Sequence, residues 1–121
     1  MIKVLLVDDM SLIRKSIKSL IHNARNINII GECKNGQEAI DFVKQNQTDV
    51  ILMDIVMPKL DGFKATKIIM NLFPEIKIIA HSSHNDDDYV KKMLEAGAVD
   101  YLIKTQCQIE LIDAIHNAYF D

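Results

Sequence analysis

Acidic, hydroxyl and ammonium side chains follow the apolar segments of this sequence. Asp8 and Asp9 close the first apolar run, Asp54 closes a later one, and Ser82 and Lys104 close two more. Carboxylate oxygens suit Mg²⁺, which takes one or two carboxylates together with water and phosphate oxygens. A carboxylate can also attack phosphorus and form an aspartyl phosphate. An ammonium and a hydroxyl could then neutralise the oxygens of the transferred group.

The elements that must position these side chains are apolar runs of strand length that alternate with segments of helical periodicity. Strands are predicted at Ile2–Val7, Ile27–Cys33, Val50–Ile55, Ile76–Ala80 and Val99–Ile103. Helices are predicted from a Ser11 cap through Ile21 and at Gly36–Gln45, Asp61–Phe73, Asp86–Ala96 and Gln108–Phe120, with Gly97 as a C-terminal stop. Near-continuous Ile, Val and Leu strands are typical of a parallel sheet that is buried on both faces. The sequence therefore predicts an α/β fold, a three-layer α/β/α sandwich around a five-stranded parallel sheet.

A parallel sheet brings the carboxyl ends of its strands to one edge, so the polar residues above should share one crevice. Any one of them alone has an ordinary interpretation as a helix cap, a loop hydroxyl or a solvated lysine. Asp61 and the Asp86–Asp88 run keep that interpretation, because they stand at predicted helix starts. The conjunction at the ends of several strands favours a site, and three clustered carboxylates require a cation among them.

Composition narrows the class of protein. The chain has 121 residues, 49% of them hydrophobic and 26% charged, which predicts one globular domain over residues 1–121. A net charge of −3 argues against a surface for nucleic acid or anionic membranes spread over the whole domain. Cys33 and Cys107 form no CxxC motif, so a reducing, cytoplasmic setting is expected. The short apolar start ends in two acids and predicts neither a signal peptide nor a membrane span.

Other phosphate-handling classes fit less well. No GxGxxG follows the first strand, which disfavours a nucleotide- or flavin-binding domain. The Asp-x-Asp-x-Thr pattern of haloacid-dehalogenase-type phosphatases is absent, since the sequence there is Asp8-Asp9-Met10-Ser11-Leu12. A small hydrolase with an aspartyl nucleophile remains an alternative.

Four motifs occur in a recognisable order. They are Val4-Leu5-Leu6-Val7-Asp8-Asp9; Asp54-Ile55-Val56-Met57-Pro58 followed by Asp61-Gly62; Ser82 after the fourth strand; and Ala96-Gly97-Ala98 leading to Tyr101-Leu102-Ile103-Lys104. On these motifs the chain resembles, over essentially its whole length, the receiver domain of bacterial two-component response regulators. The resemblance implies a flavodoxin-like, doubly wound (β/α)5 fold with strand order 2-1-3-4-5. It also implies a signalling switch that promotes only its own phosphorylation and dephosphorylation, and not an enzyme.

The resemblance assigns roles to the strand-end residues. Asp54 would accept a phosphoryl group from a sensor histidine kinase or a phosphotransfer protein. Asp9 would bind Mg²⁺ (or Mn²⁺) directly and Asp8 largely through water, with Asp54 and the backbone carbonyl of Val56 completing the metal site. Lys104 would pair with the phosphoryl oxygens.

Two further residues would form the switch. The hydroxyl of Ser82 would move to the phosphoryl group, and Tyr101 would pass from an exposed to a buried position. The output face of the family corresponds here to about Asp87–Ala96, Val99–Ile103 and Ile109–Tyr119.

Some positions modify the family pattern. Thr105 follows Lys104 where proline is common, and a cis bond before a residue other than proline costs about 3–4 kcal/mol, so a trans peptide is predicted. Val56 and His84 occupy positions that tune dephosphorylation; an apolar Val56 cannot hold water, and His84 is interpreted as a solvated loop residue. Ser83 replaces the more frequent alanine but is still small.

The resemblance also predicts what kind of process the switch controls. The Lys-Thr ending and the loop Ala80–Asp86 resemble receivers that precede a helix-turn-helix DNA-binding domain, which predicts control of transcription, with homodimerisation on phosphorylation. The domain itself has no recognition helix and should bind neither DNA nor membrane directly. A stand-alone receiver that controls a protein partner and a degenerate, unphosphorylated interaction module are the alternatives.

Overall fold

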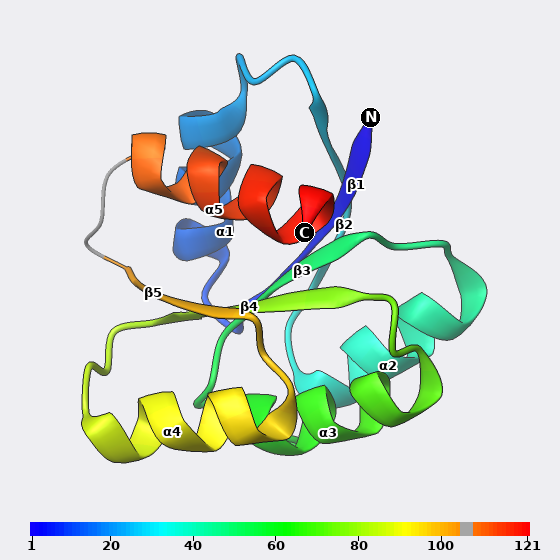
Figure 1. The fold of residues 1–121 in the computed structure, drawn as a ribbon, viewed down its shortest axis with the longest axis vertical. Helices are drawn as coiled ribbons and strands as arrows, with labels where there is room; N and C mark the ends of the chain where they lie inside the picture. The colour runs from blue at the N-terminus through cyan, green and yellow to red at the C-terminus, as the bar shows by residue number, and fades with distance from the viewer. Residues whose placement is uncertain (105–107) are drawn as a thin grey trace.

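The computed structural model describes residues 1–104 and 108–121, which form strands and helices in strict alternation (Figure 1). The strands are β1 (Ile2–Val7), β2 (Ile27–Cys33), β3 (Val50–Met53), β4 (Lys77–Ser82) and β5 (Asp100–Ile103). The helices are α1 (Ser11–Ile21), α2 (Gly36–Gln45), α3 (Gly62–Leu72), α4 (Asp87–Ala96) and α5 (Gln108–Phe120). All neighbouring strands pair in parallel, in the order β2-β1-β3-β4-β5. The predicted α/β class and strand order are confirmed.

Helices cover both faces of the sheet. Figure 1 shows α1 and α5 on one face and α2, α3 and α4 on the other. Alternate residues of β1 point to opposite sides, so Leu5 and Val7 join the core beneath α2–α4, whereas Val4 and Leu6 join the core beneath α1 and α5. Each large aliphatic side chain buried in this way contributes about 1.5–3 kcal/mol. None of the described helices is both long and apolar enough to span a membrane.

The edge strands depart from the prediction that every strand is buried on both faces. β1, β3 and β4 are almost wholly buried, but most residues of β2 and β5 are partly or well exposed. The reason is their position, because an edge strand has a neighbour on only one side and lies where the helical layers end. Apolar content alone did not reveal which strands would be central.

The ends of the elements show which local signals were correct. Asp61 caps α3 by accepting a hydrogen bond from the Lys64 N–H at 2.9 Å, and Gly97 closes α4 in the left-handed region at φ 118°. The predicted Ser11 cap is wrong, since Ser11 is the first helical residue and Met10 takes the cap position without a side-chain bond. The Asp8 carboxylate accepts from the Met10 N–H at 2.9 Å and turns the chain into α1 one residue early.

The structure describes one of the two cysteines. Cys33 is buried in the core, and this burial raises the pKa of its thiol to about 12. Cys107 and the Lys104–Thr105 peptide lie outside the described residues.

Candidate functional site

The acidic cluster is built by the pairing of β1 with β3. Val7 is aligned with Met53, and the Asp54 N–H bonds to the Val7 carbonyl at 2.9 Å, so Asp8 and Asp54 leave the sheet side by side. One carboxylate oxygen from each of Asp8, Asp9 and Asp54 lies within 4.8 Å of the others. Asp8 and Asp54 are only 2% and 6% exposed, whereas Asp9 faces solvent. The cluster is therefore a buried pair of acids with a third at its mouth.

Lys104 enters this cluster from β5. Its backbone N–H bonds to the Ser82 carbonyl at 2.8 Å, which continues the β4–β5 pairing past the strand end. Its ammonium lies 2.8 Å from Asp8 Oδ2 and 3.3 Å from Asp54 Oδ1. The structure thus brings together Asp8, Asp9, Asp54 and Lys104, as the alignment of parallel strand ends predicts.

The negative charges of the cluster outnumber the positive charge that contacts them. Burial and the neighbouring Asp8 charge raise the pKa of Asp54 to about 6, although the Lys104 ammonium and the Ile55 N–H act in the opposite direction. Burial of Lys104 works against its charge, but its hydrogen bond to Asp8 and the charge of Asp54 outweigh this and raise its pKa. Among the described residues Lys104 is the cation that contacts these acids, and it neutralises them only in part. A divalent cation would complete the balance.

Gly62 gives Asp54 the room it needs. A Cβ atom at Gly62 would lie 2.1 Å from the Asp54 carbonyl oxygen and 2.9 Å from Ile55 Cα. The Gly62 N–H also donates to the Ile55 carbonyl at 2.8 Å, so the chain crosses directly beneath the phosphoacceptor candidate. Sequence reasoning quoted this glycine only as part of a motif, and its steric role requires the packing of the α3 start against the end of β3.

Ser82 and Tyr101 meet at the backbone of the β4–α4 loop. The buried Ser82 hydroxyl accepts the His84 N–H at 3.0 Å, and the Tyr101 hydroxyl donates to the His84 carbonyl at 2.5 Å. In the part of the chain that the structure describes, Ser82 makes no hydrogen bond to the acidic cluster. His84 therefore connects the two predicted switch residues through main-chain atoms, and the Ser82 hydroxyl also acts on the Tyr101 hydroxyl, opposing in part the burial that raises the pKa of Tyr101. Sequence reasoning missed this link, because a backbone contact leaves no signal in side-chain types.

The remaining predicted positions lie at the rim. Val56 follows Asp54 by two residues and is 55% exposed, so its side chain gives the site no polar group. Its carbonyl as a metal ligand stays a prediction. The exposed His84 ring lies against the Tyr89 ring, with 4.8 Å between centroids.

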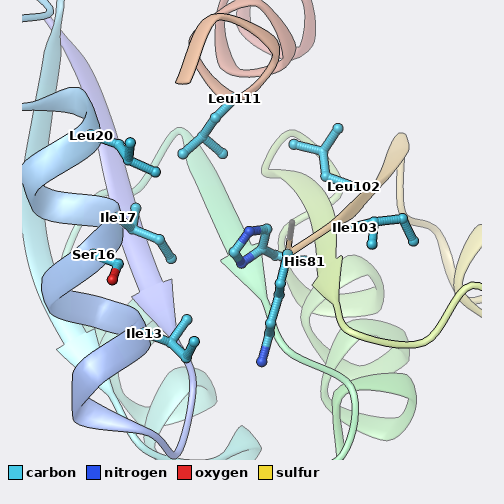
Figure 2. A pocket seen from close by; sticks show the side chains of 9 residues that line it. Ile13, Ser16, Ile17, Leu20, His81, Leu102, Ile103 and Leu111 are labelled. Carbon is cyan, nitrogen blue, oxygen red and sulfur yellow. The ribbon is translucent and has the colours of Figure 1, made fainter. Parts of the chain in front are cut away.

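His81 precedes Ser82 but belongs to the opposite face of the sheet. Figure 2 shows its ring in a small pocket between α1 and α5, near Ile17, Leu102 and Leu111. Burial, together with the Lys104 charge, lowers the pKa of His81 to about 4, so the ring is neutral at pH 7.

Comparison with known proteins identifies the family. The model of the response regulator receiver domain matches residues 4–116. The chain belongs to this family. As a receiver domain it is a signalling module and not an enzyme acting on an external substrate.

Similar proteins include transcriptional regulators. The transcriptional regulatory protein LiaR of Bacillus subtilis is 42% identical over 118 residues, which cover 98% of this chain and 56% of LiaR. The response regulator UvrY of Escherichia coli K12 is 36% identical over 119 residues, or 98% of this chain and 55% of UvrY. The receiver thus spans about half the length of the curated relatives it matches.

Solved structures agree in fold. The response regulator domain of Thermotoga maritima CheB superposes with a TM-score of 0.90 at 31% identity and covers 99% of this chain and 97% of that one. A CheX–CheY complex from Borrelia burgdorferi, described with BeF3 and Mg, gives a TM-score of 0.89 at 26% identity, with 95% and 82% of the two chains covered.

Proposed function

We propose that this receiver domain is a switch operated by a phosphoryl group on Asp54, supplied by a sensor histidine kinase or a phosphotransfer protein. The observation that carries the proposal is the cluster of Asp8, Asp9 and Asp54 oxygens within 4.8 Å, with the Lys104 ammonium in contact with two of the three acids. Such a set is costly to bury unless it serves a charged ligand.

The donor set fits Mg²⁺ (or Mn²⁺). Hard oxygen ligands, one of them exposed at the mouth, suit an ion that keeps several waters. Asp9 would bind it directly and Asp8 largely through water, with Asp54 and the Val56 carbonyl as the other protein ligands. When bound there, the ion supplies charge neutralisation for the phosphoryl oxygens.

The transfer step uses the carboxylate of Asp54 as nucleophile. Its oxygen forms a bond to phosphorus while the bond from phosphorus to the donor's histidine nitrogen breaks. The electron pair stays on the leaving imidazole, which takes a proton from solvent. Lys104 already stands beside Asp54, so its ammonium can pair with a phosphoryl oxygen without a large movement.

Phosphorylation then disturbs the β4–α4 loop. The new group adds nearly two negative charges at the end of β3, and the Ser82 hydroxyl is drawn toward it. Ser82 must release the His84 N–H to do so, and Tyr101 holds the carbonyl of the same residue. The loop would therefore have two arrangements, one in the unphosphorylated and one in the phosphorylated domain. The output face formed by α4, β5 and α5 would change together with the loop.

The proposed output is control of transcription. Relatives such as LiaR are named transcriptional regulators, and they are about twice as long as this chain. We therefore propose a cytoplasmic receiver joined to a helix-turn-helix domain, with homodimerisation on phosphorylation and no direct DNA contact by the receiver. A stand-alone receiver with a protein target and a degenerate interaction module are the alternatives.

Intact-mass measurement after incubation with Mg²⁺ and acetyl phosphate tests the proposal. The wild type should gain one phosphoryl group, and Asp54→Asn should gain none. Asp61→Asn is the matched control, because asparagine caps a helix as well as aspartate does, and it should label like the wild type.

Three other outcomes would contradict the proposal. Equal labelling of Asp54→Asn would show that Asp54 is not the acceptor. Absence of both labelling and Mg²⁺ affinity would support the degenerate module. Steady turnover of a generic phosphomonoester would support the hydrolase.

A further inference from the structure

Arg14 connects three elements around the loop that carries Asp8 and Asp9. It lies on α1, its Nη1 donates to the backbone carbonyl of Asp8 at 2.5 Å, and its Nε donates to Glu32 Oε1 on β2 at 2.9 Å. Its side chain is only 11% exposed, and its contact with the Asp8 carbonyl is partly buried, whereas its contact with Glu32 lies at the surface. A guanidinium can make two such bonds in different directions because its donors form a rigid fork.

Glu32, which binds Arg14 on the side away from Asp8, is held in its charged form. Hydrogen bonds from Lys18 and Arg14 outweigh partial burial and hold the pKa of Glu32 below its ordinary value. Lys18 reaches the second carboxylate oxygen of Glu32 at 2.8 Å but makes no contact with the acidic loop. Arg14 and Lys18 therefore share a carboxylate, while Arg14 also touches the loop.

The contact at the Asp8 carbonyl has a specific geometric consequence. That carbonyl and the Asp9 N–H belong to one peptide unit, which is planar and rigid. Fixing the carbonyl oxygen therefore fixes the direction in which the chain leaves toward Asp9. Asp9 itself is exposed, so its neighbours must supply the order that packing does not.

We infer that Arg14 is a positioning residue of the metal site, which orients the Asp8–Asp9 peptide so that both carboxylates face the same ion. This inference rests on the proposed function, because it assumes that the acidic cluster binds Mg²⁺. Arg14 would act as the supporting contact that many metal sites place behind their ligands, where substitutions typically cost roughly 10–100-fold in affinity.

The positive charge of Arg14 and its positioning role predict opposite changes in Mg²⁺ affinity when Arg14 is substituted. Arg14 is a cation near a cation site, so simple electrostatics predicts that its removal tightens Mg²⁺ binding. Loss of positioning predicts that the same substitution weakens binding. The sign of the change therefore separates the two effects, and Lys18→Met measures the effect of charge alone at the same carboxylate.

Titration calorimetry with MgCl2 on the wild type, Arg14→Met and Lys18→Met tests this. We expect Arg14→Met to weaken Mg²⁺ binding roughly tenfold and Lys18→Met to leave it within about twofold. Arg14→Lys should give an intermediate affinity, because one ammonium cannot hold both Glu32 and the Asp8 carbonyl in the geometry of the fork. This variant keeps a cation at the position and serves if Arg14→Met does not fold.

Amide hydrogen exchange of the metal-free proteins gives an independent readout. Arg14→Met should accelerate exchange at Asp9 and Met10 without a matching change in the β1 core. Unchanged or tighter Mg²⁺ binding in Arg14→Met, or acceleration spread evenly over the chain, would overturn the inference. A wild type that binds no Mg²⁺ would contradict the proposed function instead, and the exchange data would still decide whether Arg14 orders the loop.

Discussion

The loop after β1 and the loop after β4 both border the acidic cluster, but they are held very differently. In the first, the Cys33 carbonyl accepts a hydrogen bond from the Asp8 N–H, Arg14 donates to the Asp8 carbonyl, the Met10 N–H donates to Oδ1, and Lys104 forms an ion pair with Oδ2. Two of these contacts come from cations, and contacts of that kind are stronger than neutral ones. The β1–α1 loop is a fixed support.

The β4–α4 loop has far fewer constraints. Residues 83–88 are all exposed, and the side-chain bonds that hold its backbone come from Ser82 and Tyr101 to His84. Each is a neutral hydrogen bond worth about 1 kcal/mol net. An energy of that size is easily exceeded by a new doubly charged group nearby. We therefore predict that the β1–α1 loop holds its charged groups in place and that the β4–α4 loop rearranges when charge is added.

The largest predicted effect concerns the end of β3, which pairs with the end of β1 beside the fixed β1–α1 loop. Gly62→Ala should destabilise the domain by about 3 kcal/mol, because the added methyl group overlaps the Asp54 carbonyl and the backbone cannot yield without moving the end of β3. Urea unfolding measures this. Ser83→Ala, a substitution of similar size in the exposed loop, should change stability by less than about 0.5 kcal/mol. Equal costs at the two positions would show that the backbone around Asp54 is no more tightly packed than the β4–α4 loop.

A smaller effect concerns His81, which belongs to the fixed core although it adjoins Ser82. Its folded pKa of about 4 lies below the ordinary 6.5, so the unfolded chain takes up a proton that the folded state refuses. The stability that the neutral ring supports is present above pH 6.5 and is lost as the pH falls toward 4. Between pH 7 and 4.5 this loss should be about 2 kcal/mol.

His81→Gln should remove that part of the pH dependence. Denaturant unfolding of both proteins at several pH values would show a shallower profile for the variant. An unchanged slope would mean that the ring is accessible to solvent and does not belong to the fixed core.

The smallest predicted effect concerns the β4–α4 loop. Tyr101→Phe removes the hydroxyl that holds the His84 carbonyl, which should lower stability by no more than about 1 kcal/mol. It should raise amide exchange at His84 by up to about fivefold, with labelling by acetyl phosphate retained. Exchange that rises equally at Met10 would show that the loops are not independent.

Much of this site could be predicted from the sequence, because it depends on local signals. The runs that end at Asp8 and Asp54 are buried parallel strands, and parallel strands finish at one edge; the same reasoning brings Lys104 to the cluster. The Asp61 cap was also predictable, since it depends on residues three positions apart.

Other features depend on packing between distant segments and leave no local signal. In the sequence Arg14 cannot be told from a solvated helix residue, because its partner Glu32 comes from a different element, β2. The Ser11 cap prediction failed because the Asp8 side chain turns the chain one residue earlier. The link between Ser82 and Tyr101 passes in part through the backbone of His84, which any residue type could provide.

Site-resolved amide hydrogen exchange of the domain in Mg²⁺, with and without acetyl phosphate, tests the division of the site most directly. Asp54→Asn under the same conditions is the control, and intact mass confirms the phosphorylation. Phosphorylation should alter exchange at His84, whose N–H the Ser82 hydroxyl releases, by at least about fivefold, which corresponds to the loss of one hydrogen bond, and should alter Met10 by less than about twofold. Equal changes in both loops, or none in a protein shown to be phosphorylated, would contradict the account.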